Sequence, residues 1–292
     1  MKLLAPAKTN LFLEVRARRT DGFHELDTVF AALALADELE LSPLPGGRIE
    51  LQVEGPADVP ADASNLAWRA AEALRGAAGR PELGAALRLR KRIPAGGGLG
   101  GGSSDAAAVL RGLDRVWGTD LGPARLHALA AGLGSDVPFF LQAGLQRGRG
   151  RGEALAPLPA PARELDLVLA LPGFGCPTPE VYRALAPFLP GPEGPREPAA
   201  LLAALRAGDA GAVGAARWHR LELPAFARWP RLRELRDLLR ARPGVTGALL
   251  SGSGSTLLAV CVDAPAATRL AGELAREGLA ALPTRTAWGE PT

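Results

Sequence analysis

Cysteine, methionine, tyrosine and histidine are all scarce in this chain. Among 292 residues there are 2 cysteines, 1 methionine, 1 tyrosine and 3 histidines. The cysteines, Cys176 and Cys261, lie far apart in the sequence, which fits a reducing compartment better than a disulfide framework. The cysteines and histidines also lack the spacing of a zinc site. These shortages argue against a disulfide-stabilised secreted domain and against a zinc module.

Long hydrophobic runs are missing as well. No apolar stretch approaches the length needed to span a membrane, and Lys2, Lys8 and Arg16 interrupt any signal-peptide core after Met1. We therefore expect a cytoplasmic protein with no membrane partner. With 292 residues, 47% of them hydrophobic, the chain can bury ordinary cores, and its length predicts about two domains.

The excess of charge of one sign is small. The formal net charge is +3 and reflects arginines spread along the chain, which gives little support for a nucleic-acid partner. The basic run Arg147-Gly-Arg149-Gly-Arg151 is more typical of a solvated hairpin than of a nucleic-acid patch. We expect a small-molecule substrate, no nucleic acid, and a monomer or weak homodimer.

Asparagine and lysine are nearly absent, although arginine is plentiful. Asparagine occurs only at Asn10 and Asn65, and lysine only at Lys2, Lys8 and Lys91. Such a bias is typical of a thermophilic or high-GC source, in which thermolabile side chains are avoided. A residue retained against this bias indicates a specific chemical task, although Asn65 also suits a helix cap.

Glycine, in contrast, is concentrated in one loop, residues 94–104, with the sequence Pro-Ala-Gly-Gly-Gly-Leu-Gly-Gly-Gly-Ser-Ser. Such a run cannot pack a core, but its bare amide groups can surround an anion. A strand is predicted before it and an apolar helix, Ser104–Trp117, after it, capped by Ser103 or Ser104. A glycine loop that leads into a helix N-terminus is a phosphate cradle.

Three kinds of phosphate loop compete for this segment. The Walker pattern fails because Ser103, not lysine, follows Gly102. Gly96, Gly98 and Gly101 match the dinucleotide fingerprint, but that match is nearly automatic in such a run, and about ninety residues precede it. A flexible linker is disfavoured by the regular elements on both sides. We favour a loop of the small-molecule kinase type, whose serine hydroxyls reach a metal or a phosphate.

Strands and helices alternate along both halves of the chain. The apolar patterns predict strands at residues 11–15, 28–35, 39–42, 49–53, 86–93, 165–171, 246–250, 256–262 and 282–286. They predict helices at residues 65–78, 104–117, 123–131, 179–185, 199–207, 231–242 and 264–277. A segment rich in glycine, arginine and proline, residues 144–161, reads as a hairpin and crossover. We expect α+β domains with largely antiparallel sheets, divided into residues 1–150 and 151–292.

Two polar residues and one turn could carry chemistry. Lys8 could stabilise a developing alkoxide or a transferred phosphoryl group, although a surface lysine is an equal alternative. Asp136 lies beside an apolar run and suits a general base, although an aspartate in a Gly-Ser-Asp turn is more often a turn former. Phe23 and His24 at a turn suit stacking on a ring and hydrogen bonding to its edge. No Gly-x-Ser-x-Gly elbow is present, so a hydrolase is a poor fit.

Together these motifs resemble one family closely. The resemblance lies in Pro6–Leu11, Asp21–Glu25, Pro94–Ser104, Gly134–Pro138, Pro177–Pro179 and Ser251–Gly254, which follow in family order over nearly the whole chain. They are similar to the 4-diphosphocytidyl-2-C-methyl-D-erythritol kinases, a branch of the galactokinase, homoserine kinase, mevalonate kinase and phosphomevalonate kinase (GHMP) superfamily. The glycine loop carries the superfamily, whereas the segment from Lys8 to His24 and the Pro-Thr-Pro turn carry the branch.

The resemblance implies the two-domain GHMP-kinase fold, with an N-terminal ATP-binding domain and the active site in the cleft between the domains. It implies transfer of the ATP γ-phosphoryl group to the 2-hydroxyl of a cytidine diphosphate sugar alcohol, in the non-mevalonate route to isoprenoid precursors. Mg²⁺ would bridge the phosphates, with Ser103 or Ser104 as candidate ligands. Relatives often have tyrosine in place of Phe23 and alanine in place of Ser135. No glutamate matches the metal-binding acid of some superfamily members.

The resemblance also implies a role for each matching residue. Asp136 would be the base, and Lys8 would hold and polarise the hydroxyl. Phe23 and Tyr182 would enclose the cytosine, and His24 would bind its edge. The substrate site would also include Asn10 and Thr178. The residues implied for ATP are Asn65, Lys91, Pro94, Ala95, Gly96, Gly97, Gly98, Leu99, Gly100, Gly101, Gly102, Ser103 and Ser104.

Two other functions stay open at this point. A non-catalytic nucleotide- or RNA-binding module would use the loop and the arginines. A nicotinamide oxidoreductase would use the fingerprint glycines and is the poorest fit. Loss of turnover in an Asp136→Ala variant would separate the kinase from a binding module, which should be indifferent to that change.

Overall fold

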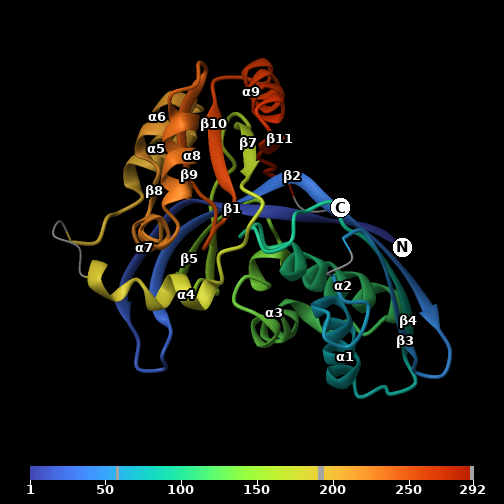
Figure 1. Cartoon of the computed structure of the whole chain (residues 1–292). Coiled ribbons are helices and arrows are strands. Elements are labelled where there is room, and N and C mark those ends of the chain that lie inside the picture. Colours follow the sequence, from blue (N-terminus) through green and yellow to red (C-terminus); the bar gives the residue numbers. More distant parts are fainter. Residues whose placement is uncertain (57–58, 190–193, 290–292) are drawn as a thin grey trace.

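The computed structural model describes residues 1–56, 59–189 and 194–289, and its helices pack on two β-sheets (Figure 1). The larger sheet contains β1 Lys2–Arg18, β2 His24–Leu44, β3 Ile49–Glu54, β4 Gly84–Arg90, β5 Leu145–Gly150, β6 Ala154–Pro157 and β8 Trp218–His219. The smaller sheet contains β7 Asp166–Leu171, β9 Val245–Leu250, β10 Leu257–Cys261 and β11 Ala280–Arg285. Pairing is antiparallel except between β3 and β4 and between β1 and β8. The expected α+β class with largely antiparallel sheets is confirmed.

Helices cover both sheets. Those of the first half are α1 Leu66–Ala78, α2 Gly101–Trp117 and α3 Gly122–Leu133, followed by the 3-10 turn η1 Pro138–Leu141. Those of the second half are α4 Thr178–Arg183, η2 Ala186–Phe188, α5 Ala199–Ala207, α6 Ala210–Ala216, α7 Glu222–Arg228, α8 Pro230–Arg240 and α9 Ala264–Arg276. The sequence patterns did not predict strand β8 or helices α6 and α7. Within the described ranges, no helix is both long and apolar enough to cross a bilayer.

Strands β1 and β2 are far longer than predicted, and a change of register within them prepares a polar site. Leu3 and Ala5 of β1 lie in the core that α2 covers. The pairing of β1 with β2 shifts between Pro6 and Lys8, after which Lys8 lies opposite Ala32 and Asn10 opposite Phe30. Ala32 and Phe30 belong to that same core. Since paired residues share a face, the shift turns even-numbered polar side chains toward the side of the sheet that α2 covers.

A shared core joins the two sheets. On β7, Leu167 and Leu169 pack with Leu11 and Val29 of the larger sheet, whereas Val168 packs on the opposite face of the smaller sheet. The smaller sheet is therefore buried on both faces, which explains its continuous apolar strands. The larger sheet also extends beyond residue 150, because β6 pairs with β5 and β8 pairs with β1. The segment 144–161 forms the expected hairpin, as an extension of the larger sheet.

Candidate active site

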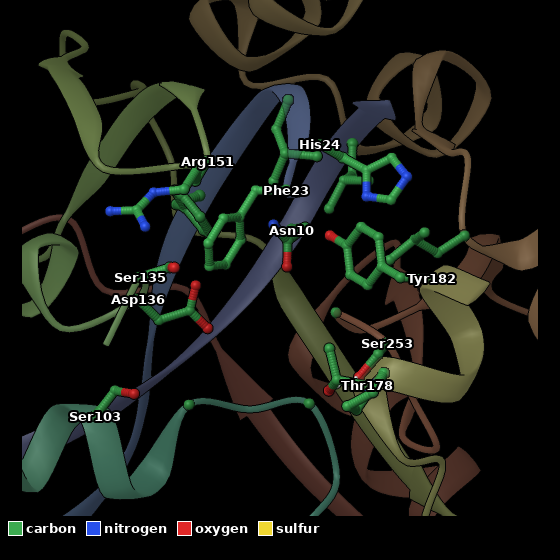
Figure 2. Close-up of a pocket in the computed structure, with 18 of the residues that line it drawn as sticks. Asn10, Phe23, His24, Ser103, Ser135, Asp136, Arg151, Thr178, Tyr182 and Ser253 are labelled. Atoms are coloured by element: carbon green, nitrogen blue, oxygen red, sulfur yellow. Dashed lines mark hydrogen bonds between the residues drawn. The ribbon is translucent and has the colours of Figure 1, made fainter. Parts of the chain in front are cut away.

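A cavity of about 690 Å³ brings together half of the residues singled out in the sequence. Its walls come from β1, the β1–β2 turn, the glycine loop, the turn before η1, helix α4 and the loop between β9 and β10 (Figure 2). The predicted residues that line it are Lys8, Asn10, Phe23, His24, Gly98, Gly100, Ser103, Asp136, Thr178 and Tyr182. Both halves of the chain therefore contribute to one site.

A chain of buried hydrogen bonds fixes Lys8 on strand β1. Its Nζ donates to Asn10 Oδ1 (2.9 Å), and Asn10 Nδ2 donates to Thr28 Oγ1 (2.8 Å). Thr28 Oγ1 in turn donates to the Phe12 carbonyl (2.7 Å). The ammonium also lies 5.5 Å from the centre of the Phe30 ring, and the Lys8 side chain is only 5% exposed. Lys8 is thus a buried, positioned cation rather than a surface lysine.

Asp136 faces Lys8 across the cavity. Its Oδ2 lies 3.5 Å from Lys8 Nζ, and its side chain is 38% exposed. It stands in the turn between α3 and η1, where Ser135 also lines the cavity. An opposed carboxylate and ammonium at this distance can hold a hydroxyl group between them and accept its proton. Figure 2 shows the Asp136 carboxylate directed into the space below Phe23.

The glycine loop packs directly against Lys8. The Lys8 amide donates to the Leu99 carbonyl (2.9 Å). Gly100 has a φ of +73°, and a Cβ there would lie 2.8 Å from the Phe140 ring and 3.0 Å from Lys8 Cγ. Gly98 has a φ of +76°, and a Cβ there would collide with the Ser251 carbonyl oxygen. Glycine is required at both positions by backbone conformation and by close approach.

The start of α2 corrects one prediction. The helix begins at Gly101, with Gly100 as its N-cap and no side-chain cap, so Ser103 and Ser104 stand inside the first turn instead of capping it. The reason is the left-handed Gly100, which turns the chain into the helix earlier than the apolar pattern indicates. The first-turn amides have no partner within a helix and so can donate to an anion. Ser103 lines the cavity, whereas the Ser104 hydroxyl is buried with no hydrogen-bond partner in the described residues.

The other predicted loop residues lie around this point. Pro94, Ala95 and Gly97 line a separate hollow of about 250 Å³, and the Leu99 side chain is buried in the core shared by the two sheets. Gly96, Gly101 and Gly102 line neither of these two spaces.

Lys91 and Asn65 lie away from the large cavity and already have partners. Lys91 Nζ pairs with Asp37 and with Asp105 Oδ2 (2.6 Å), and its side chain is 5% exposed. Burial alone would lower the pKa of Lys91, but the two carboxylates raise it, so the side chain stays charged. Asn65 caps α1, since its Oδ1 accepts from the Ala67 amide (2.9 Å) and its Nδ2 donates to the Pro60 carbonyl (2.7 Å). Their assignment to ATP stays a prediction.

Aromatic side chains form the other end of the cavity. Phe23 is 49% exposed at the β1–β2 turn, and Tyr182 comes from α4. The rings of His24 and Tyr182 lie 5.1 Å apart between centroids. Burial and the nearby Arg18 lower the pKa of His24, so its ring is neutral at pH 7. Phe23 and Tyr182 both line the cavity, and Figure 2 shows them on opposite sides of Asn10. We refer to the space between the two rings as the slot.

Several lining residues were missed by the sequence analysis. Ser253 Oγ lies 2.7 Å from Thr178 Oγ1, which joins the β9–β10 loop to the start of α4. The sequence signal for Ser253 is the segment Ser251–Gly254, which contributes to the family resemblance but has no predicted role. Arg18, Arg151 and Arg183 also line the cavity. The basic run that ends at Arg151 was interpreted as a solvated hairpin, and Arg18 and Arg183 had no signal of their own because arginine is common in this chain.

The described residues contain no group of three histidine, cysteine, aspartate or glutamate side chains that could hold a metal ion. The oxygen donors beside the glycine loop include the Ser103 and Ser104 hydroxyls. They fit a Mg²⁺ ion that takes most of its ligands from phosphates and water, which is how Mg²⁺ is usually bound beside a nucleotide.

Comparison with known proteins points to one family. The family models described as GHMP kinases N terminal domain and GHMP kinases C terminal match residues 65–144 and 201–280. A protein of Pelotomaculum thermopropionicum named 4-diphosphocytidyl-2-C-methyl-D-erythritol kinase is 44% identical over 285 residues, covering 97% of this chain and 96% of its own. One of the same name from Thermus thermophilus is 45% identical over 277 residues, covering 94% and 93%.

Solved structures agree with this. A crystal structure of 4-(cytidine 5'-diphospho)-2C-methyl-D-erythritol kinase has a TM-score of 0.83 at 43% identity, covering 99% of this chain and 100% of that one. Homoserine kinase from Cytophaga hutchinsonii has a TM-score of 0.72 at 20% identity, covering 100% of this chain and 96% of that one, which shows a shared fold.

Proposed function

The chain belongs to the 4-diphosphocytidyl-2-C-methyl-D-erythritol kinase family of GHMP kinases, and we propose that it transfers the γ-phosphoryl group of ATP to the 2-hydroxyl of that cytidyl sugar alcohol. It is a small-molecule kinase with the two-domain GHMP fold, and the reaction is the kinase step of the non-mevalonate route to isoprenoid precursors. The single observation that carries the proposal is the Lys8–Asp136 pair, 3.5 Å apart, in one cavity with the glycine loop.

Asp136 and Lys8 act on the acceptor hydroxyl. The Asp136 carboxylate takes the hydroxyl proton as the oxygen attacks the γ-phosphorus, and the bond from that phosphorus to the bridging oxygen of ADP breaks. Lys8 holds the hydroxyl oxygen and offsets the negative charge that grows there and on the transferred group. Asn10 fixes the lysine, because its Oδ1 accepts a hydrogen bond from Nζ. Phosphoryl transfer needs chiefly such positioning and charge stabilisation.

ATP occupies the glycine-loop side of the site. The first-turn amides of α2 and the loop 94–104 hold its phosphates, and Asn65 and Lys91 lie toward the nucleoside. Ser103 and Ser104 would provide hydroxyl ligands for Mg²⁺, which would neutralise phosphate charge. We assign residues 1–150 to the ATP-binding domain and residues 151–292 to the substrate-side domain.

The aromatic end receives the cytosine. Phe23 and Tyr182 stack on its two faces, and His24 hydrogen-bonds to its edge. Thr178 is held by Ser253 and lines the path between the base and the acceptor hydroxyl. All of these groups come from one chain, so we propose that a monomer or weak homodimer is active, in the cytoplasm and without a nucleic-acid partner.

The decisive test is a coupled assay with ATP, Mg²⁺ and the cytidyl substrate, run on the wild type and on Asp136→Ala. We expect turnover by the wild type and a loss of about 10²- to 10⁴-fold in the variant, with ATP binding almost unchanged. Turnover of homoserine or mevalonate in place of the cytidyl substrate would refute the substrate assignment. An indifferent Asp136→Ala variant would point to a non-catalytic binding module.

A further inference from the structure

Phe23 is unusually exposed for a residue that stacks on a ligand, because it stands at the tip of a turn. At 49% it is among the most exposed large apolar side chains of the described residues. The turn itself is well ordered by hydrogen bonds: Arg19 N donates to the Phe23 carbonyl (2.8 Å), and the Phe23 amide donates to Asp21 Oδ1 (3.1 Å). These contacts fix the backbone but leave the orientation of the ring to be set by a side-chain neighbour.

Arg151 is that neighbour. Its guanidinium lies over the Phe23 ring, 4.7 Å from the ring centre. Figure 2 shows Phe23 between Arg151 on one side and Tyr182 on the other. The guanidinium therefore lies over one face of the ring, and in this view it stands on the side away from Tyr182. A cation over an aromatic face is attracted by the ring quadrupole.

The β5–β6 turn holds Arg151 beside the β1–β2 turn. Gly150 pairs with Leu26 in the sheet, which brings the two turns to the same edge. The Gly150 amide donates to Glu25 Oε1 (3.2 Å). Glu153 accepts from the Arg151 amide (2.6 Å) and lies 3.6 Å from its Nε, so the side chain is oriented as well as placed.

We propose that Arg151 is a positioning residue for cytidyl-substrate binding, which holds the Phe23 ring from behind in the orientation that stacks on the base. This rests on the proposed function. The stack would then run Arg151, Phe23, cytosine, Tyr182. Phenylalanine at position 23 has no hydroxyl group to anchor it, so the arginine supplies the missing restraint through the ring face.

The test compares Arg151→Gln with Arg149→Gln by steady-state kinetics. Arg149 is an exposed arginine of the same hairpin that does not line the cavity, so it controls for the loss of one positive charge. For Arg151→Gln we expect the KM of the cytidyl substrate to rise about two- to fivefold, the range of an exposed cation–π contact. The kcat and the KM of ATP should stay unchanged, and Arg151→Lys should recover part of the loss.

A second measurement separates positioning through Phe23 from direct contact with the substrate phosphates. Binding of cytidine and of cytidine diphosphate is measured by calorimetry for the wild type, Arg151→Gln, Phe23→Ala and the double variant. Positioning predicts that Arg151→Gln weakens both ligands by the same factor, and that it adds nothing in the Phe23→Ala background. Weakening of cytidine diphosphate alone, or a full additional loss in the double variant, would overturn the inference in favour of a phosphate contact.

An error in the kinase function and an error in the role of Arg151 would give different results. If the wild type does not phosphorylate the cytidyl substrate and binds neither ligand, the proposed function is wrong. If the wild type is active and Arg151→Gln matches it in KM and in cytidine binding, only the role of Arg151 is wrong. Thermal unfolding of each variant shows whether the fold is retained.

Discussion

The two ends of the cavity are built in opposite ways. At the acceptor end, Lys8 and Asn10 project from the middle of a buried strand and are held by a chain of hydrogen bonds. At the base end, Phe23 stands on an exposed turn and is backed by one arginine. Under the proposed function, the groups assigned to the chemistry are held by the protein's own hydrogen bonds, whereas those assigned to recognition stand where a substrate can enter.

The acceptor end should tolerate the least change. Lys8→Met keeps the length of the side chain but removes the charge and leaves Asn10 Oδ1 without its donor. We expect kcat to fall about 10²- to 10³-fold, as when a transition-state donor is removed, with ATP affinity nearly intact. Steady-state kinetics together with ATP calorimetry checks this. A kcat within threefold of the wild type would end the contrast between the two ends.

Acid should also distinguish the buried His219, which lies outside the cavity, from His24 at the base end. His219 is fully buried, its ring nitrogens have no hydrogen-bond partner in the described residues, and burial, with a contribution from Lys8, lowers its pKa to about 3. A lowered folded-state pKa gives stability that is present above pH 6.5 and is lost as the pH falls toward 3. At pH 5 this amounts to about 2 kcal/mol of unfolding free energy.

Two variants test the acid prediction. Urea unfolding at pH 7.5 and pH 5 should show that His219→Leu loses less stability on acidification than the wild type does. His24→Gln, at the half-buried base end, should lose nearly as much as the wild type. If His219→Leu and the wild type lose the same unfolding free energy between pH 7.5 and pH 5, His219 is not a buried neutral side chain in the folded protein.

Substitutions at the base end should affect substrate binding alone. Removing the ring in Phe23→Ala should raise the KM of the cytidyl substrate by about 5- to 100-fold, the range for loss of one base-stacking contact. The kcat at saturation and the KM of ATP should not move, since neither depends on the base. A fall in kcat larger than the rise in KM would show that this end takes part in the chemistry as well.

The smallest effect is expected where the two ends meet. Thr178→Val removes the hydroxyl that bonds Ser253 across the cavity wall. A neutral hydrogen bond of this kind contributes about 0.5–1.5 kcal/mol, so we expect a change of about two- to tenfold in kcat/KM. Ser253→Ala removes the same bond from the other side and should match it. A change confined to one of the two variants would mean that the hydroxyl removed in that variant contacts the substrate directly.

The sequence predicted the local features of this site and missed those that depend on distant pairing. The glycine loop, the helix after it and the retained Lys8 and Asn10 were visible because each has its own local signal. Strand β8 was not, since it is two residues long and exists only through its pairing with β1. The contact of Arg151 with Phe23 was not predictable either, because it depends on the pairing of β5 with β2.

Scarcity proved an incomplete guide to function. It singled out Lys91 and Asn65 together with Lys8 and Asn10. In the structure Lys91 pairs with two buried carboxylates, and Asn65 caps helix α1. Each residue type is therefore needed for a structural contact. A rare residue type therefore marks a specific requirement, which can be structural as easily as chemical.

The register shift between Pro6 and Lys8 decides which side chains of β1 face the cavity. Before the shift, Leu3 and Ala5 point under α2, and after it Lys8 and Asn10 do so, up to a second shift between Asn10 and Phe12. Deletion of Ala7 would realign the strand by one residue, so that Thr9 turns toward the cavity and Lys8 and Asn10 turn toward the core between the sheets. Strand length near residue 7 is therefore under the same constraint as the identity of Lys8 itself.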